Sequence, residues 1–139
     1  MGVYRGKIEL DTEHELCVLD ITPKVRNIIN ASGFRNGIVN VFVQGSTAAI
    51  STIEYEDGLV TDLSHALERI APRHIEYHHH LRWHDDNGRS HIRATVIGAE
   101  LTLPFENGEL LTGTWQQIVL IELDTRGRRR KVFVTVIGE

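Results

Sequence analysis

The sequence contains almost no cysteine, since Cys17 is the only one in 139 residues. A single thiol cannot form an internal disulfide, and it cannot supply the paired cysteines of a structural zinc site. Because Cys17 lies in the apolar segment LCVLDI, we expect it to be a small buried hydrophobic residue rather than a reactive thiol.

Long apolar segments are also missing. No apolar run approaches the roughly 20 residues that a helix needs to cross a bilayer. The opening MGVYRGKIELD lacks the apolar core of a signal peptide. Both absences predict a cytoplasmic protein that has no membrane partner.

The chain carries no excess of positive charge. Its 15 Lys and Arg residues face 19 Asp and Glu residues, and the resulting net charge of −4 disfavours nucleic acid as a partner. The basic segment RGRRRK at 126–131 fits a solvated hairpin that protects a sheet edge. The alternative for this segment is a patch that binds phosphate or nucleic acid.

What the sequence does contain is the composition of one ordinary globular domain. It is 41% hydrophobic and 24% charged, and a chain of this length buries enough surface to fold without a disulfide or a metal. We therefore expect a single domain over residues 1–139.

Two main helices are expected from the spacing of apolar residues. The first begins at its N-cap Thr22 and ends before Gly33. The second is capped by Asp57 and stopped by Pro72. A shorter helix begins at Ser90, which suits an N-cap.

The remaining regular segments are rich in β-branched residues or alternate apolar and polar residues, which is typical of strands. The first two would form a hairpin, as would the segments around Asn107-Gly108 and around 125–127. The order of elements favours an α+β fold with a mixed or antiparallel sheet. Consecutive apolar residues in VFVTVI suggest that a helix or another subunit covers a second face of that sheet. The expected strands are 3–10, 16–21, 37–45, 48–55, 100–104, 114–124 and 131–138.

Histidine is concentrated in one segment, because six of the eight histidines fall between positions 74 and 91. Residues 73–89 show no regular period and are too many for an idle connection. Imidazoles and carboxylates in one loop can assemble a metal site with an open coordination position. The alternative is a solvated loop, since no spacing such as HExxH occurs. Tyr77 and Trp83 favour function, because a solvated loop has no need of their apolar surface.

Three weaker patterns accompany this segment. The turn Gly45-Ser46-Thr47 can cradle phosphate oxygens, or it is a plain tight connection. Acidic residues from 54 to 62 can hold Mg²⁺ beside a diphosphate, although helix capping and solvation explain them equally well. The pair Trp115-Gln116 offers a stacking surface beside an amide, with a core tryptophan as the alternative.

Four segments, taken in order, resemble the YjbQ-like family, whose members are also called secondary thiamine-phosphate synthases. They are GSTAAISTIEYEDG, the pattern YxHxxxWxDxNGxSHIRA at 77–94, GTWQ at 113–116 and the closing IGE. The resemblance spans nearly the whole chain. It implies a small α+β domain that forms a homotrimer, with pockets between neighbouring subunits and with members that carry a bound zinc ion or an anion.

The activity implied by the resemblance is thiamine-phosphate synthesis. In that reaction a hydroxymethylpyrimidine diphosphate is joined to a thiazole phosphate and diphosphate is released. The partner would be a small phosphorylated molecule, Zn²⁺ or Mg²⁺ would assist, and no organic cofactor is implied. Many bacterial members have His at the position of Gly45, so this chain lacks one candidate ligand or proton carrier. The alternative hypothesis is a non-catalytic trimeric module that binds an anionic ligand or partner.

The resemblance also assigns roles to individual residues. His79 and His91 become the metal-binding or acid/base pair, with Glu54 as the catalytic carboxylate. The expected substrate-binding residues are Ser46 and Thr47 in an anion-binding turn, Arg93 as a positive charge on phosphate oxygens, and Trp115 with Gln116 as pocket lining.

Overall fold

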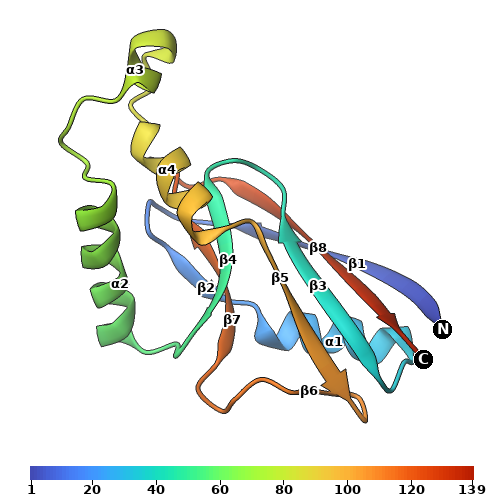
Figure 1. The fold of residues 1–139 in the computed structure, drawn as a ribbon. Coiled ribbons are helices and arrows are strands. Elements are labelled where there is room, and N and C mark those ends of the chain that lie inside the picture. The colour runs from blue at the N-terminus through green and yellow to red at the C-terminus, as the bar shows by residue number, and fades with distance from the viewer.

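The computed structural model describes residues 1–139 and contains two antiparallel sheets and four helices (Figure 1). The larger sheet has the order β1-β8-β3-β5-β6, and the smaller one has the order β2-β7-β4. The strands are β1 (Gly2–Asp11), β2 (Val18–Asp20), β3 (Gly37–Val43), β4 (Ala48–Ile53), β5 (Glu100–Glu106), β6 (Glu109–Leu110), β7 (Gln117–Glu122) and β8 (Arg129–Gly138). The helices are α1 (Thr22–Ser32), α2 (Asp57–Ile70), α3 (His78–Trp83) and α4 (Gly88–Ile97).

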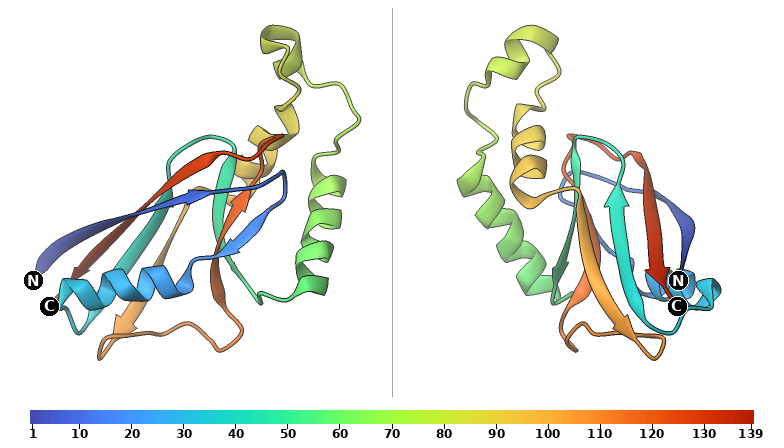
Figure 2. Two further views of the ribbon diagram at one scale, coloured as in Figure 1. Left: turned by 180° about the vertical axis from the view of Figure 1, so that it is seen from behind. Right: turned by 45° about the vertical axis from the view of Figure 1, so that its right-hand side comes forward.

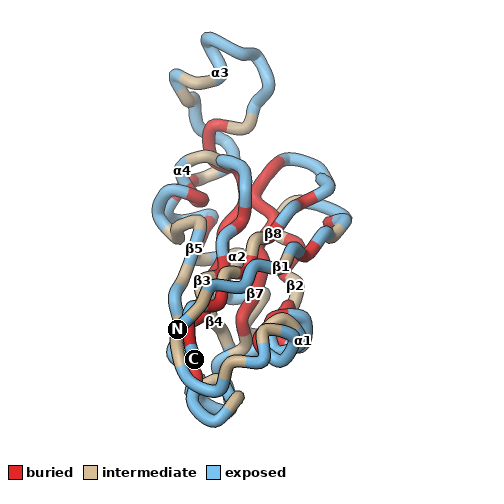
Figure 3. Tube along the Cα trace, turned by 90° about the vertical axis from the view of Figure 1, so that its right-hand side faces the viewer, coloured by how far each residue is buried: buried red, intermediate tan, exposed pale blue.

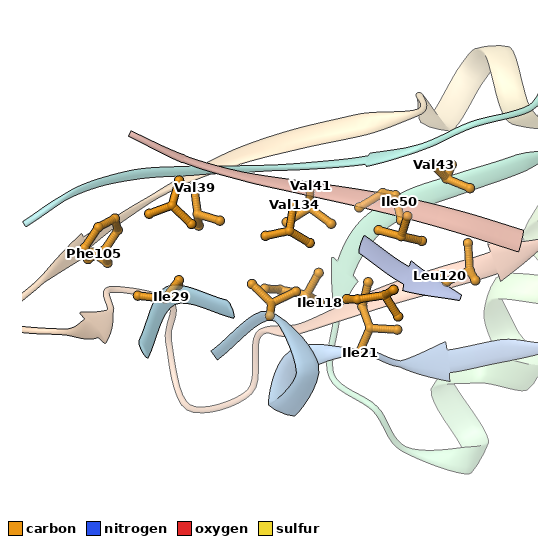
Figure 4. Packing of buried hydrophobic residues seen from close by; sticks show 14 of the residues in the cluster. Ile21, Ile29, Val39, Val41, Val43, Ile50, Phe105, Ile118, Leu120 and Val134 are labelled. Atoms are coloured by element: carbon orange, nitrogen blue, oxygen red, sulfur yellow. The ribbon is translucent and has the colours of Figure 1, made fainter. Parts of the chain in front are cut away.

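The main core lies between the inner face of the larger sheet and the layer formed by α1 and the smaller sheet (Figure 4). Alternate valines of β3 point into it and pair with alternate valines of β8, as in Val39 opposite Val136 and Val41 opposite Val134. Ile29 of α1 and Ile118 of β7 pack against them from the other side. The alternation expected for β3 is therefore confirmed, and burial also alternates along β8, because one face of the sheet is buried.

A second core lies on the other face of the smaller sheet, where Leu67 of α2 and Ala94 of α4 pack on Ala49 and Ile121. The smaller sheet is consequently covered on both faces, which explains why successive residues of β4 and β7 are buried. Figure 2 shows α2 and α4 beside this sheet and α1 on its opposite side. The helix α3 has no buried residue and projects from the top of the molecule (Figure 3).

These observations confirm the α+β class, and every strand pairing is antiparallel rather than mixed. Two expected hairpins are wrong. β1 pairs with β8 whereas β2 pairs with β7, and the consecutive strands β7 and β8 also lie in different sheets. The hairpin at Asn107-Gly108 is confirmed, since β5 pairs with β6 and both turn residues have positive φ.

The expected N-caps are also corrected. The Thr22 hydroxyl accepts from the backbone N–H of Ile118 at 2.8 Å, so it ties α1 to β7 instead of capping the helix. Glu56 caps α2 by accepting from the backbone N–H of Leu59 at 3.1 Å, one residue before the predicted cap. Ser90 lies inside α4 and is fully buried. The expected loop 73–89 contains the short helix α3.

None of the four helices combines the length and the apolar character needed to cross a membrane. Cys17 is buried and unpaired, in agreement with its expected role as a small hydrophobic residue.

Candidate functional site

The two histidines singled out in the sequence meet where α3 approaches α4. The ring centroids of His79 on α3 and His91 on α4 are 4.5 Å apart, with their planes inclined by 44°. The connection between the helices is sharp because His84 and Asp86 both adopt positive φ. This reversal brings together two residues that are twelve positions apart in the sequence.

Neighbouring side chains orient the ring of His79. Its Nδ1 atom lies 3.4 Å from Oδ1 of Asp85. The amide nitrogen of Asn87 lies 3.3 Å from the same Nδ1 and donates to Oδ1 of Asp85 at 2.9 Å. Since Nδ1 is engaged, Nε2 is the nitrogen of His79 that remains free for a ligand.

The turn Gly45-Ser46-Thr47 faces the same region from the start of β4. Ser46 is exposed, whereas the hydroxyl of Thr47 is buried and donates to Oδ2 of Asp124 at 3.1 Å. The turn and α4 border an open cavity of about 270 Å³. The residues that line it are Gly45, Ser46, Ala48, His91, Ala94, Thr95, Gly98 and Ala99. The predicted anion-binding turn and His91 therefore share one cavity, with Thr47 supporting the turn from below.

Two groups beside this cavity, His91 and Asp124, have pKa values below their ordinary values. Burial lowers the pKa of His91 below its ordinary value, His79 lowers it further, and Asp124 and Asp85 oppose the shift. Burial alone would raise the pKa of Asp124. Hydrogen bonds from the Thr125 backbone and the Thr47 hydroxyl, together with Arg128, lower it overall. At neutral pH the cavity thus presents an uncharged imidazole, with a carboxylate behind the turn.

This arrangement predicts how His91 titrates. Its pKa in the folded protein should lie below the ordinary 6.5, and His79→Ala should move it upward because the repulsive neighbour is lost. In the unfolded chain His91 binds protons more readily. The stability that its neutral ring confers is therefore complete above about pH 6.5 and is lost as the pH falls through the folded pKa.

Histidine NMR titration of the native protein measures this pKa directly. His65→Ala, on the exposed surface of α2, is the matched control and should leave the pKa of His91 unchanged. A native pKa for His91 at or above 6.5 would contradict the prediction.

The other predicted site residues lie elsewhere. Glu54 follows the far end of β4, seven residues from Thr47 and therefore about 23 Å along the strand at roughly 3.3 Å per residue. Glu54 and Trp115, which is 71% exposed, line a separate cavity of about 600 Å³ together with Asp20, Tyr55, Glu56, Asp57 and Gln117. Gln116 is outside that lining, and its Oε1 accepts from the backbone N–H of Gly113 at 2.9 Å. One chain therefore does not bring Glu54, Trp115 or Gln116 to the histidine pair.

Arg93 also lies outside the cavity beside His91. Its side chain is 1% exposed and is engaged by Glu15, by Glu68 and by the carbonyl oxygen of Ala71. The side chain points into the protein interior, because Arg93 lies on the buried face of α4 with Arg89 and Ala94. All three of its nitrogens donate to these partners, so Arg93 anchors α4 rather than meeting a phosphate.

Sequence reasoning missed a buried polar cluster beneath the turn. Arg130, placed within a solvated hairpin from its sequence, is 5% exposed and pairs with the fully buried Glu122. Arg130 shares the inward face of β8 with Val132, Val134 and Val136. This two-residue period was the signal in the sequence that Arg130 points inward. Elsewhere in the same basic segment, Arg129 pairs with Glu9 and Asp11.

The histidine pair offers an incomplete set of metal ligands within one chain. No group of three His, Cys, Asp or Glu side chains is arranged to hold a metal ion. The free nitrogens of His79 and His91 amount to two ligands, whereas catalytic zinc sites usually have three from protein. Any metal at this place would need ligands from outside the chain.

Comparison with known sequences places the chain in one family. A sequence model described as UPF0047 protein YjbQ-like matches residues 6–139. A UPF0047 protein from Methanothermobacter thermautotrophicus is 40% identical over 139 residues, which cover 100% of this chain and 95% of that relative. A UPF0047 protein from Archaeoglobus fulgidus is 32% identical and covers 91% of this chain and 96% of its own length.

Solved structures agree with the sequence comparison. The crystal structure of a YbjQ-like protein of unknown function from Sulfolobus solfataricus P2 matches with a TM-score of 0.94 and 38% identity, covering 99% of both chains. A hypothetical protein from Aeropyrum pernix K1 matches with a TM-score of 0.88 and 32% identity, covering 97% of this chain and 98% of its own. Sequence and fold together therefore show that the chain belongs to the UPF0047 family of YjbQ-like proteins.

Proposed function

We propose that this protein is a thiamine-phosphate synthase-like enzyme that acts on small phosphorylated heterocycles in the cavity beside His91. The reaction would join a hydroxymethylpyrimidine diphosphate to a thiazole phosphate and release diphosphate. The observation that carries the proposal is the shared cavity, in which an uncharged imidazole faces an exposed hydroxyl on a glycine-containing turn. Such a site is suited to binding phosphate oxygens and to accepting a proton at neutral pH.

Each residue of the site has a defined part in this proposal. Ser46 and the backbone of its turn bind phosphate oxygens, which positions the diphosphate. His91 accepts a proton or a hydrogen bond, since burial keeps it uncharged. His79, held at Nδ1 by Asp85, directs Nε2 toward the ligand.

Complementation of a strain that lacks thiamine-phosphate synthase tests the reaction. The wild-type chain should restore growth without thiamine, His79→Ala and His91→Ala should each abolish the rescue, and His65→Ala should retain it. A wild-type chain that fails to rescue, although it is expressed and folded, overturns the reaction. Full rescue by both site variants overturns the site assignment.

The metal prediction has its own measurement. Elemental analysis of protein purified without an affinity tag should find a stoichiometric transition metal if the imidazole pair is a ligand set, and His91→Ala should remove that metal. Absence of any metal from active wild-type protein would contradict the prediction of zinc or magnesium.

One observation favours a second candidate function, a non-catalytic module that binds an anionic ligand or partner. Glu54 and Trp115 lie at the opposite end of β4 from His91, so a single chain does not assemble a carboxylate and a stacking surface around the turn. Isothermal titration with the pyrimidine and thiazole phosphates separates the candidates. Binding without turnover supports the module, whereas turnover supports the enzyme.

The proposal also includes assembly into a homotrimer. The outer face of the larger sheet has no helix over it and carries two apolar cross-strand pairs, Phe42 with Phe133 and Ile38 with Ile137. Exposed apolar patches of this kind are typical of protein interfaces. If a neighbouring copy binds to this face, pockets between subunits can form.

Replacement of Phe42 by glutamate is therefore expected to weaken assembly strongly, because a charge would be buried without a partner in the apolar centre of the interface. Sedimentation velocity should show a trimer for the wild type and a shift toward monomer for Phe42→Glu. Ile70→Glu, at an exposed site on α2, is the matched control and should remain trimeric. A wild type that sediments as a monomer at micromolar concentration would contradict the trimer.

A further inference from the structure

Arg130 has one nitrogen atom that its buried ion pair leaves unused. Its Nε donates to Oε1 of Glu122 at 2.8 Å, and its Nη2 donates to Oε2 of the same carboxylate. The Nη2 atom also donates to the carbonyl oxygen of Thr47 at 3.0 Å and to its hydroxyl at 2.9 Å. No hydrogen bond within the chain involves Nη1. Of the five N–H groups of the guanidinium, the two on Nη1 are therefore available.

This free nitrogen lies directly against Gly45. A Cβ atom added at Gly45 would stand 2.9 Å from Nη1 of Arg130. Gly45 has a φ of 125°, a conformation that strains other residues, and it lines the same cavity as Ser46 and His91. Arg130 itself is not among the residues that line the cavity, but the missing side chain of Gly45 leaves Nη1 uncovered beside a residue that does line it.

The position of Arg130 is fixed before any ligand arrives. Its side chain is 5% exposed and is held through two of its three nitrogens by the fully buried Glu122 and by Thr47. A charged donor held this rigidly loses little conformational freedom when it binds. Each of the two N–H groups on Nη1 can donate a charge-assisted hydrogen bond to an oxygen of a phosphoryl group.

We propose that Nη1 of Arg130, reached over Gly45, binds a phosphoryl group of the ligand together with the hydroxyl of Ser46. Arg130 thereby takes the role of positive charge that sequence reasoning assigned to Arg93. The inference rests on the proposed function for the identity of the cavity, and it deepens that function by naming the residue that selects a phosphorylated ligand. The binding itself requires no turnover.

Isothermal titration of the purified protein with inorganic phosphate at pH 7.5 tests this directly. The first variant, Glu122→Leu with Arg130→Met, removes the guanidinium and its buried partner together, so that no uncompensated charge remains. The second variant, Gly45→Ala, leaves the ion pair in place and sets a methyl group against Nη1. Arg129→Met is the matched control, because it removes an exposed arginine one position away that pairs with Glu9 and Asp11.

Phosphate should bind the wild type and Arg129→Met with affinities that agree within about twofold. It should bind Gly45→Ala and the double variant at least tenfold more weakly, about 1.4 kcal/mol. Circular dichroism establishes that each variant is folded, and if the double variant is not, Gly45→Ala decides alone. Wild-type affinity in Gly45→Ala, an equal loss in Arg129→Met, or no binding to the wild type overturns the inference. Failure of genetic complementation with phosphate binding intact overturns the synthase reaction only.

Discussion

Replacing Glu15 by alanine is expected to lower the free energy of unfolding by about 3–5 kcal/mol, the usual effect of removing one partner from a buried ion pair. The Glu15 side chain is 12% exposed. Both of its oxygens accept from Arg89, at 2.8 Å from Nε and 2.8 Å from Nη2. One oxygen also lies 3.3 Å from Nη1 of Arg93.

The size of this effect follows from what the substitution leaves behind. Arg89 and Arg93 are each 1% exposed, so loss of the carboxylate leaves two buried guanidinium groups short of negative charge. The hydrogen bond with Glu15 is the main reason that the pKa of Arg89 is raised. Without Glu15, Arg89 still cannot respond by releasing its proton, because a guanidinium stays protonated in proteins. Both arginines belong to α4, which carries His91.

Urea unfolding followed by circular dichroism measures this loss. Glu13→Ala is the matched control, because Glu13 is exposed and precedes Glu15 by two positions, and its replacement should change stability by less than about 0.5 kcal/mol. A loss below about 1 kcal/mol for Glu15→Ala would contradict the assigned role of this carboxylate.

Replacing Glu122 by leucine should produce a loss of similar size, about 3–5 kcal/mol, because Arg130 would keep its charge in a buried place without a partner. Glu122 is fully buried at the end of β7. It also accepts from the hydroxyl of Thr12 at 2.6 Å and from the backbone N–H of Asp124 at 3.0 Å. The pair therefore lies at the centre of a polar cluster beneath the turn at Gly45.

Adding Arg130→Met to Glu122→Leu should restore much of the lost stability. The double variant buries two apolar side chains of similar length in place of the ion pair, an exchange that is often neutral or stabilising. Recovery should be incomplete, because Thr12 and the Asp124 backbone lose an acceptor at about 1 kcal/mol each. The same urea experiment on the two single variants and the double variant gives the coupling energy. Additive losses in the double variant would show that the pair is not coupled.

The sequence predicted the individual helices and strands better than it predicted which strands pair with each other. The spacing of apolar residues located α1, α2 and the valine-rich strands, since it records which face of each element is buried. It did not indicate that β1 pairs with β8 or that β7 and β8 enter different sheets. Those pairings depend on long-range packing, which a local pattern does not contain.

The candidate site shows the same division. The density of histidines located the segment 74–91, and the family resemblance assigned His79 and His91 within it. The structure brings these two rings together. The resemblance assigned a phosphate-binding role to Arg93, and the basic segment 126–131 placed Arg130 in a solvated hairpin. Neither pattern tells which arginine is already neutralised by a buried carboxylate. The structure shows that Glu15 and Glu68 occupy Arg93, whereas Glu122 leaves one nitrogen of Arg130 free.

The two histidines are held by helices that differ in how firmly they pack, because His79 lies on the projecting helix α3 and His91 lies on α4. α3 contributes no buried residue, whereas α4 is anchored by Arg89 and Arg93. Amide hydrogen exchange should therefore be fast in α3 and slow in β7, because local opening of α3 exposes almost no apolar surface. His79 can move away from His91 while the core stays folded. A ligand that is too large to fit while the two rings are in contact can therefore enter without global unfolding.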